Sequence, residues 1–170
     1  MELASAALGF GAVVALLLCS AFFSSSETAI FSLPAAWVDE RAATGDRRAT
    51  TLKRLRQDPH RLLVTILVGN NLVNVAISSI VTVLLVERFS AGVAVSAATL
   101  LVGTVVLVFG EIVPKSYGLG NARRWSLVVA GPVSLVERAI SPLVSLFDAL
   151  TRRLTAWLGG ESDIEKSYTE

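Results

Sequence analysis

The chain has 170 residues, of which 53% are hydrophobic and only 17% charged, and its mean hydropathy is +0.63. This composition is poorly suited to a surface that faces water on every side, so it predicts an integral membrane domain in a lipid bilayer. The net charge of +1 and the lack of a basic stripe interleaved with aromatic residues exclude nucleic acid as a partner. The single cysteine, Cys19, lies in an apolar stretch, so it provides neither a disulfide framework nor a thiolate metal site.

Three stretches are long enough to cross a bilayer, which takes roughly 20 apolar residues. We expect transmembrane helices over about 3–33, 62–86 and 91–113. The first stretch has no basic residue before it and is too long for the hydrophobic region of a signal peptide, so we expect a helix of the mature protein. Only a few residues separate the second helix from the third, so these two should form a tight antiparallel hairpin.

A basic segment follows the first span, and we expect it to form a pair of short helices within 34–57. Pro34 is suited to the start of one helix, Gly45 to its end, and Asp46 to the N-cap of the next. The segment is typical of a solvated cytoplasmic face that determines topology, and contact with anionic lipid is the functional alternative. His60, the only histidine, lies at the start of the second span, where we expect no ligand or catalytic role.

Basic residues cluster on two of the connecting segments, and the positive-inside rule places both in the cytoplasm. The N-terminus is then outside, the C-terminus is cytoplasmic, and the chain is a multi-pass protein of the cell (inner) membrane. The connection between the second and third spans carries Arg88 alone. The cytoplasmic basic residues are Arg41, Arg47, Arg48, Lys53, Arg54, Arg56 and Arg61, and, after the third span, Lys115, Arg123 and Arg124.

The region 121–158 is apolar but interrupted by polar and proline residues. We expect it to form juxtamembrane helices that lie in the inner interface. A fourth span over about 125–147 is the alternative. It would bury Glu137 and Arg138 near its middle, at a free-energy cost that depends on whether these two charges pair.

Polar side chains recur inside all three spans, where each costs free energy unless it finds a partner. Glu111 is ionisable at membrane depth, which by itself marks a functional site. Pro114 has no N–H to donate to the carbonyl four residues back, so in an α-helix the C=O of Gly110 loses its partner. We expect the serines, the asparagines and Glu111 to lie at similar depths. The polar residues of the first two spans that we consider for such a site are Ser20, Ser24, Ser25, Ser26 and Glu27, and Asn70, Asn71 and Asn74.

These donors are all oxygens, which excludes a zinc or copper site and suits Mg²⁺ or Ca²⁺, with Na⁺ as a further candidate. One or two carboxylates fit Mg²⁺. Glu27 is either a second charge at such a site or the partner of a cytoplasmic basic residue. The structural alternative is that the serines bond to the preceding turn and that the asparagines hold neighbouring helices together.

Three segments, 24–29 (SSSETA), 69–74 (GNNLVN) and 110–115 (GEIVPK), resemble in order and spacing the transmembrane domain of the CorC and cyclin-M (CNNM) magnesium transporters. The resemblance covers nearly the whole chain. It implies an all-α homodimer whose subunits each have three spans, a cytoplasmic helix pair and a belt-like juxtamembrane helix. It also implies export of Mg²⁺, with Na⁺ as the coupling ion.

The same resemblance assigns roles to individual residues. Ser25, Asn70 and Glu111 would be side-chain ligands of Mg²⁺, and the carbonyl of Gly110 would complete the shell. Ser24 and Asn74 would lie close by.

Members of that family usually continue into CBS-type nucleotide-binding modules. We therefore expect residues 1–158 to be a transmembrane domain and 159–170 an acidic cytoplasmic tail or linker. The rival interpretation is a membrane anchor and dimerisation domain without its own ion site, which leaves Glu111 and the asparagines without a role. An intramembrane hydrolase would need a nucleophile with a base in reach, so we expect no enzyme. Small residues that would let the helices of a dimer approach closely are Ala94, Ala97, Ala98 and Gly103.

Overall fold

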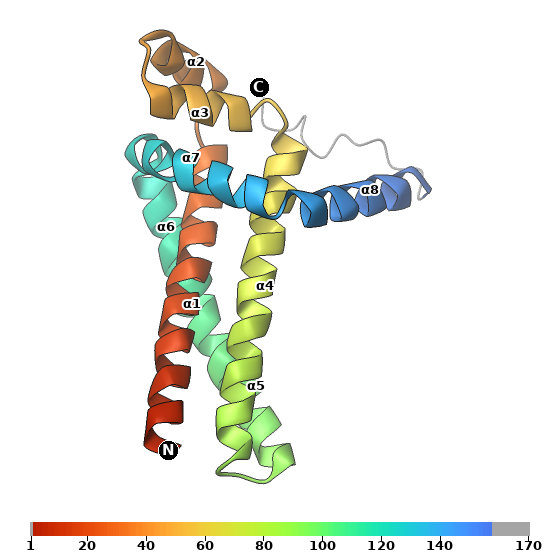
Figure 1. Ribbon diagram of the computed structural model, residues 1–170. Helices are drawn as coiled ribbons and strands as arrows, with labels where there is room; N and C mark the ends of the chain where they lie inside the picture. The colour runs from red at the N-terminus through yellow and green to blue at the C-terminus, as the bar shows by residue number, and fades with distance from the viewer. Residues whose placement is uncertain (1, 158–170) are drawn as a thin grey trace. The chain divides into compact units, whose positions relative to one another are not determined.

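A computed structural model describes residues 2–157, and within that range it contains helices and short connections but no strand. The predicted all-α fold is therefore confirmed (Figure 1). The expected tail, 159–170, lies outside the described residues. The helices are α1 (Glu2–Phe31), α2 (Ala35–Ala43), α3 (Arg47–Leu55), α4 (Pro59–Val86), α5 (Ala91–Val105), the π-helix η1 (Val106–Ile112), α6 (Val113–Gly120), α7 (Ala122–Ala139) and α8 (Ser141–Trp157).

Three single helical segments are long and apolar enough to cross a membrane, as many as the spans predicted from the sequence. These segments are Ala7–Phe31, Pro59–Val86 and Ala91–Gly120. The third continues past its expected end at Val113, because Pro114 does not stop the helix. Pro114 lies in the first turn of α6, directly after η1, and a proline in a first turn removes no hydrogen bond that the following helix needs.

The helices divide into two compact units, and α4 contributes residues to both. Unit 1 consists of Met1–Ser32 and Gly69–Ala122, and it contains α1, α5, η1, α6 and most of α4. Unit 2 consists of Leu33–Val68 and Arg123–Glu170, and its described part contains α2, α3, α7, α8 and the start of α4. The sequence predicts a single domain over 1–158, so this division is visible only in the tertiary structure.

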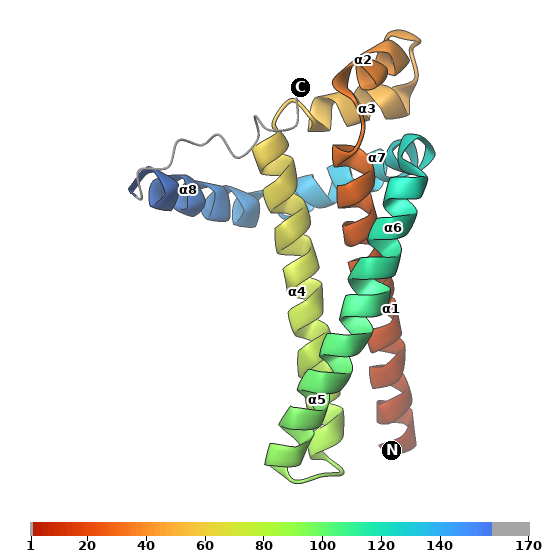
Figure 2. The same ribbon diagram turned by 180° about the vertical axis from the view of Figure 1, so that it is seen from behind.

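In unit 1, α1 packs along η1 and α6, as both views of the ribbon show (Figures 1 and 2). Gly118 permits this contact, because a Cβ at that position would clash with the backbone carbonyl of Ser25. Toward the other end of the unit, α4 and α5 contribute to a small core of Ile77, Val102 and Val106. The connection between these two helices occupies only residues 87–90, which confirms the predicted tight hairpin.

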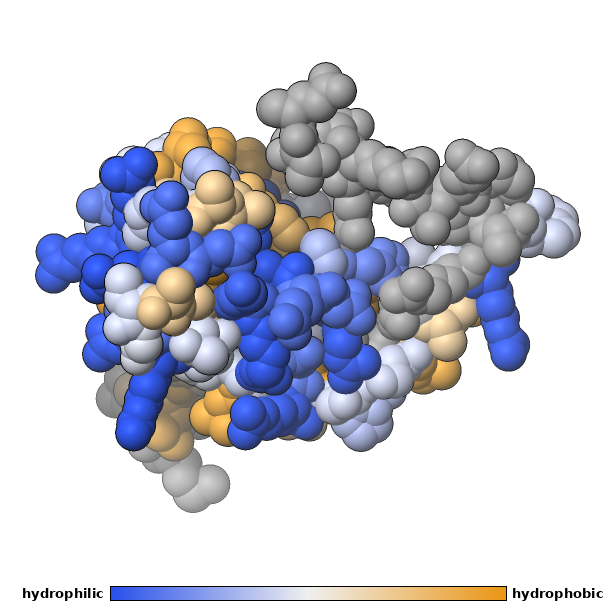
Figure 3. All heavy atoms as spheres, turned by 90° about the horizontal axis from the view of Figure 1, so that it is seen from above, coloured by the Kyte–Doolittle hydropathy of each residue, from blue (hydrophilic) through white to orange (hydrophobic). Residues whose placement is uncertain are grey.

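In unit 2, α2 and α3 form the helix pair expected within 34–57. Gly45 ends α2 with a φ of +80°, a conformation that glycine adopts readily. Asp46 caps α3 by accepting the N–H of Arg48 at 2.9 Å, and this hydrogen bond holds the pKa of the Asp46 carboxyl below its usual value. Leu52 and Leu55 are buried. Hydrophilic residues predominate on the face seen in Figure 3.

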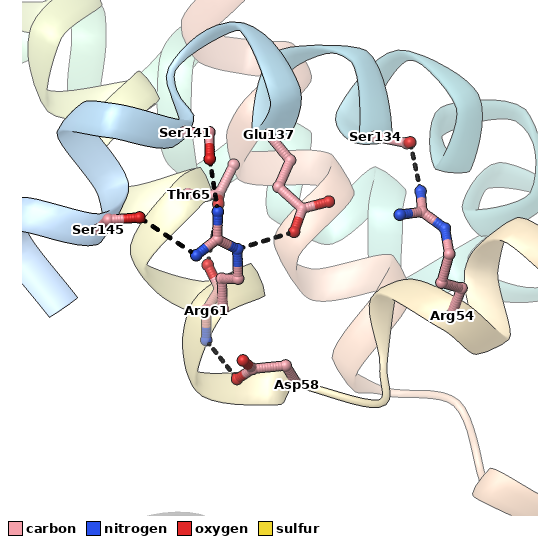
Figure 4. A network of polar contacts seen from close by, with 8 residues as sticks. All are labelled: Arg54, Asp58, Arg61, Thr65, Ser134, Glu137, Ser141 and Ser145. Atoms are coloured by element: carbon pink, nitrogen blue, oxygen red, sulfur yellow. Dashed lines mark hydrogen bonds and ion pairs between the residues drawn. The ribbon is translucent and has the colours of Figure 1, made fainter.

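A polar network joins the start of α4 to α7 and α8 within unit 2 (Figure 4). The guanidinium of Arg61 donates through Nε to Glu137 Oε1 at 3.1 Å and through Nη2 to Ser141 Oγ at 2.8 Å. Nearby, Arg54 donates to Ser134 Oγ. The partner of Glu137 is therefore Arg61 and not Arg138, the neighbour considered from the sequence.

Helices α7 and α8 meet at a bend of 70°. By length and composition, Ala122–Ala139 and Ser141–Thr151 together would suffice for one bent crossing. Helix α7 also has a buried stripe that includes Val129, Val133 and Ser134, as an amphipathic helix should. Both arrangements considered from the sequence fit this geometry, and the interfacial position of 121–158 stays a prediction.

Candidate cation site

Polar residues of α1 and α4 meet at Ser20 in unit 1. Ser20 is completely buried, and its Oγ lies 3.0 Å from Asn70 Oδ1 and 2.8 Å from Asn74 Oδ1. The two asparagines are four residues apart on α4, so their amides project to the same side of the helix, as their spacing predicts. A hydroxyl group has one proton and can donate it to only one of these two oxygens at a time. The close oxygens therefore suit a cation, or a rotated amide that presents its N–H.

Helix η1 closes this cluster at Gly110. A Cβ added there would lie 2.8 Å from Ser20 Oγ, so a residue with a side chain could not bring the backbone of η1 this close. One turn along α1, Ser24 is only 1% exposed, and its hydroxyl has no hydrogen-bond partner among the described residues. A buried hydroxyl without a partner is costly, which marks the position as a place for a ligand or a water molecule.

The π-helix η1 is a feature that the sequence did not predict. Its register is visible at Val113, whose N–H donates to the C=O of Val108, five residues back. Because Pro114 has no N–H, it cannot donate a hydrogen bond to the C=O of Phe109, as the π register would require, or to the C=O of Gly110, as the α register would require. The free carbonyl predicted at Gly110 therefore lies at a change of helical register, and such short π segments are frequent at functional sites.

Glu111 is half-buried and lines a cleft next to the Ser20 cluster. Asn74 borders both, so the cluster and the cleft are adjacent. The cleft has a volume of about 440 Å³. Six water molecules, at roughly 30 Å³ each, occupy about 180 Å³, so the cleft has room for a cation that keeps its inner hydration shell. Its lining residues are Asn74, Ser78, Thr99, Val102, Gly103, Val106, Leu107 and Glu111.

Ser25 faces in another direction from Ser20. The hydroxyl of Ser25 donates to the C=O of Phe22 at 3.1 Å, and the hydroxyl of Ser26 donates to the same oxygen at 2.6 Å. At 3.6 residues per turn, five residues along α1 amount to a rotation of about 140° beyond one full turn. The structure thus brings Ser20, rather than Ser25, to the asparagines, and the assignment of Ser25 as a ligand stays a prediction. Asn71 is exposed.

Glu27 forms an ion pair with Lys115, with 3.4 Å between its Oε2 and the Nζ of the lysine. Of the two roles that the sequence left open for Glu27, this pair favours partnership with a basic residue. Among the described residues, no group of three or more histidine, cysteine, aspartate and glutamate side chains comes together. Glu111 is the one acidic residue that lines the cleft, so a cation site there would combine neutral oxygens with its carboxylate.

The three candidate spans and the buried cluster of oxygens between them define an integral membrane domain. The family of the chain relates it to transport proteins. The family model for the cyclin M transmembrane N-terminal domain matches residues 11–170, so the chain belongs to this family. The resemblance found in the three sequence motifs is thereby confirmed.

Curated relatives fall in the same group. The chain is 34% identical over 146 residues to the UPF0053 inner membrane protein YfjD of Escherichia coli, covering 85% of this chain and 34% of the relative. It is 34% identical over 158 residues to a putative DUF21 domain-containing chloroplastic protein of Arabidopsis thaliana, covering 93% of this chain and 24% of the relative. It is 26% identical over 151 residues to the polyamine export protein of Haemophilus influenzae, covering 82% of this chain and 35% of the relative. The chain therefore spans about a third or less of the length of these relatives.

Proposed function

We propose that this chain is the membrane domain of a Mg²⁺ transporter, which binds the cation between α1, α4 and η1 and moves it across the membrane. The observation that carries the proposal is the convergence of Ser20, Asn70 and Asn74 oxygens in a buried position beside a cleft lined by Glu111. Mg²⁺ is bound in proteins by oxygen ligands, usually with one or two carboxylates and several retained waters. The cluster and the cleft together offer that combination.

The ligand set in this proposal has two parts. Asn70, Asn74 and Ser24 contribute neutral oxygens, together with a backbone carbonyl near Gly110, and Glu111 contributes the negative charge. Ser20 holds the two amides in place. Ser25 would join the set through a rearrangement of α1, because its hydroxyl is bonded to the backbone of its own helix.

The wider transport cycle is also part of the proposal. We propose, from the positive-inside rule applied to the basic segments, an N-terminus outside and a C-terminus in the cytoplasm. We propose export of Mg²⁺, with Na⁺ as the coupling ion, by a homodimer that carries CBS-type modules in a longer protein. Ala94 and Ala98 are buried inside unit 1 and Gly103 lines the cleft, so a dimer contact through small residues would use Ala97.

A polyamine is the second candidate substrate, because one relative is a polyamine export protein. A linear ammonium compound would also suit a cleft that combines a carboxylate with apolar residues. The anchor interpretation is the third candidate, and it predicts that neither kind of cation binds.

The test is the thermal stability of the purified chain in detergent with Mg²⁺, Ca²⁺, Na⁺ or spermidine. A ligand that binds only the folded state at 100 times its Kd stabilises that state by about 2.7 kcal/mol. We expect this stabilisation with Mg²⁺ for the wild type, and its loss in Glu111→Ala and Asn70→Ala. The matched control is Glu87→Ala, which removes an exposed carboxylate in the hairpin and should leave the response unchanged.

The other outcomes discriminate between the candidates. Stabilisation by spermidine but not by Mg²⁺ would move the assignment to an organic polycation. Identical melting curves with every ion, for the wild type and both site variants, would support the membrane anchor and end the proposal of a transport site.

A further inference from the structure

The cleft beside Glu111 continues well beyond the candidate cation site. Its lining along the third span extends from Glu111 in η1 to Thr99 in α5, and α4 contributes Asn74 and Ser78. These ends are 12 residues apart in the sequence, which corresponds to roughly 18 Å along a helix. Since the hydrocarbon core of a bilayer is about 30 Å thick, the cleft covers more than half of that depth.

The direction of the cleft follows from the order of its residues. Thr99 lies eight residues after Ala91, the start of α5, and therefore about 12 Å from the α4–α5 hairpin. Glu111 lies roughly 30 Å from that hairpin by the same measure. The cleft thus leads from the carboxylate toward the hairpin side of the membrane.

The lining offers oxygen lone pairs at its far end. The hydroxyl of Thr99 donates its proton to the C=O of Val95 at 2.9 Å, so the lone pairs of that oxygen are left to accept from water or to face a cation. On the opposite wall, Ser78 provides a second hydroxyl. Val102 and Val106 are buried in the core of unit 1 and form an apolar floor between the polar ends.

Gly103 keeps the middle of the cleft wide. It lies among the lining residues, and a Cβ at this position would meet nothing within 4 Å. A larger side chain at 103 would therefore fill the cleft without displacing any neighbour within that distance.

We propose that this cleft is a water-filled passage, which carries a hydrated cation between the site at Glu111 and the hairpin side of the membrane. The inference rests on the proposed function, because a passage needs a cation to transport. Ser78 and Thr99 replace part of the cation's outer hydration along the way, and Gly103 sets the width of the passage. With the orientation proposed above, this is the outward half of the pathway.

The first experiment measures flux. Gly103→Leu, reconstituted in liposomes, should reduce Mg²⁺ flux about tenfold or more, because the diameter of a passage limits what it conducts. The matched control is Gly92→Leu on the same helix, where a Cβ also meets nothing within 4 Å but which does not line the cleft, and it should leave the flux unchanged. Gly103→Leu should keep the stabilisation by Mg²⁺, because the site at Glu111 is intact.

The second experiment measures water access, in a Cys19→Ser background that removes the natural exposed thiol. Gly103→Cys should react with a membrane-impermeant trimethylammonium thiol reagent, and Mg²⁺ should slow the reaction. Leu100→Cys is the control, since Leu100 is 73% exposed on the same helix but does not line the cleft. A thiol surrounded by lipid forms little thiolate and should not react with the charged reagent.

Several results would overturn the passage. If Gly103→Cys is as unreactive as Leu100→Cys, lipid fills the cleft. If the thiol of Gly103→Cys instead resists the reagent but forms a disulfide with a second copy of the chain, the cleft is a dimer interface. If the thiol reacts but Gly103→Leu conducts like Gly92→Leu, the cleft is hydrated but is not the cation's route. Failure of Mg²⁺ to stabilise the wild type would instead contradict the proposed function itself, so the two failures are distinguishable.

Discussion

The ion pair between Arg61 and Glu137 should be the strongest single polar contribution to the stability of unit 2. It joins the first turn of α4 to the last turn of α7, and the same guanidinium also donates to Ser141 (Figure 4). Replacement of Arg61 by methionine keeps the aliphatic stem of the side chain but removes its charge and all its donors. Glu137 would then be left without its partner while only 16% exposed.

The size of the effect follows from this burial. Breaking a fully buried pair by removing one partner costs about 3–5 kcal/mol, whereas exposed pairs contribute about 0–1 kcal/mol. The two side chains are 28% and 16% exposed, so this pair lies between these limits and nearer the buried one. We expect Arg61→Met to cost about 2–3 kcal/mol of unfolding free energy, since some water still reaches the pair. For a chain of this size that lowers the Tm by roughly 4–12 °C.

A double-mutant cycle in detergent, read by thermal unfolding, tests this reasoning. The double variant Arg61→Met/Glu137→Leu should recover most of the loss, because it leaves no charge buried without a partner. The matched control is Lys53→Met, which breaks the exposed pair with Asp39 and should cost less than about 1 kcal/mol. Additive losses within about 0.5 kcal/mol in the Arg61 and Glu137 variants would refute the coupling.

Two further predictions concern backbone contact and pH. Gly118→Ala should destabilise unit 1 by about 2–3 kcal/mol, because its Cβ meets the backbone of Ser25, whereas Gly120→Ala, which meets nothing within 4 Å, should be neutral or slightly stabilising. Equal melting temperatures for these two variants would contradict the close packing of α6 on α1. The N–H of Arg48 lowers the pKa of Asp46 in the folded state, so the capping stabilisation is fully present above the unfolded pKa of about 4 and is lost as the pH falls through the lower folded value. The difference in Tm between the wild type and Asp46→Asn should therefore be constant near neutral pH and shrink in acid, and a difference that grows on acidification would show that the cap is not the cause.

Features that depend on neighbouring residues were predictable from the sequence. The end of α2 follows from Gly45 and the start of α3 from Asp46. A glycine in the left-handed conformation and an N-cap side chain both act within one turn of the helix. The third span was predicted to end at about Val113, and the helix that carries it continues to Gly120. Whether a proline ends a helix depends on the hydrogen-bond register of the residues before it. No local sequence motif predicts the π register of η1.

The candidate site was predicted in part. The spacing of Asn70 and Asn74 correctly indicated two amides on one face of α4. The role of Glu111 as a cation ligand stays a prediction from its charge at membrane depth. Ser20 was less prominent in the sequence than the run of serines after it. The rotation of α1 against α4 decides which serine meets the amides. Helix α1 also lies in close contact with Gly110 of η1 and Gly118 of α6.

The amino-acid sequence by itself determined the helical class, the number of candidate spans and the family. The length of apolar stretches, helix caps and the order of motifs depend only on residues that are close together or ordered along the sequence. Only the tertiary structure decided that Ser20 joins the two asparagines, that a cleft leads away from Glu111, and that Arg61 pairs with Glu137, 76 residues away. The physical reason is that helices form through hydrogen bonds within one segment, whereas the choice of facing side chains depends on how closely the backbones of different segments can approach.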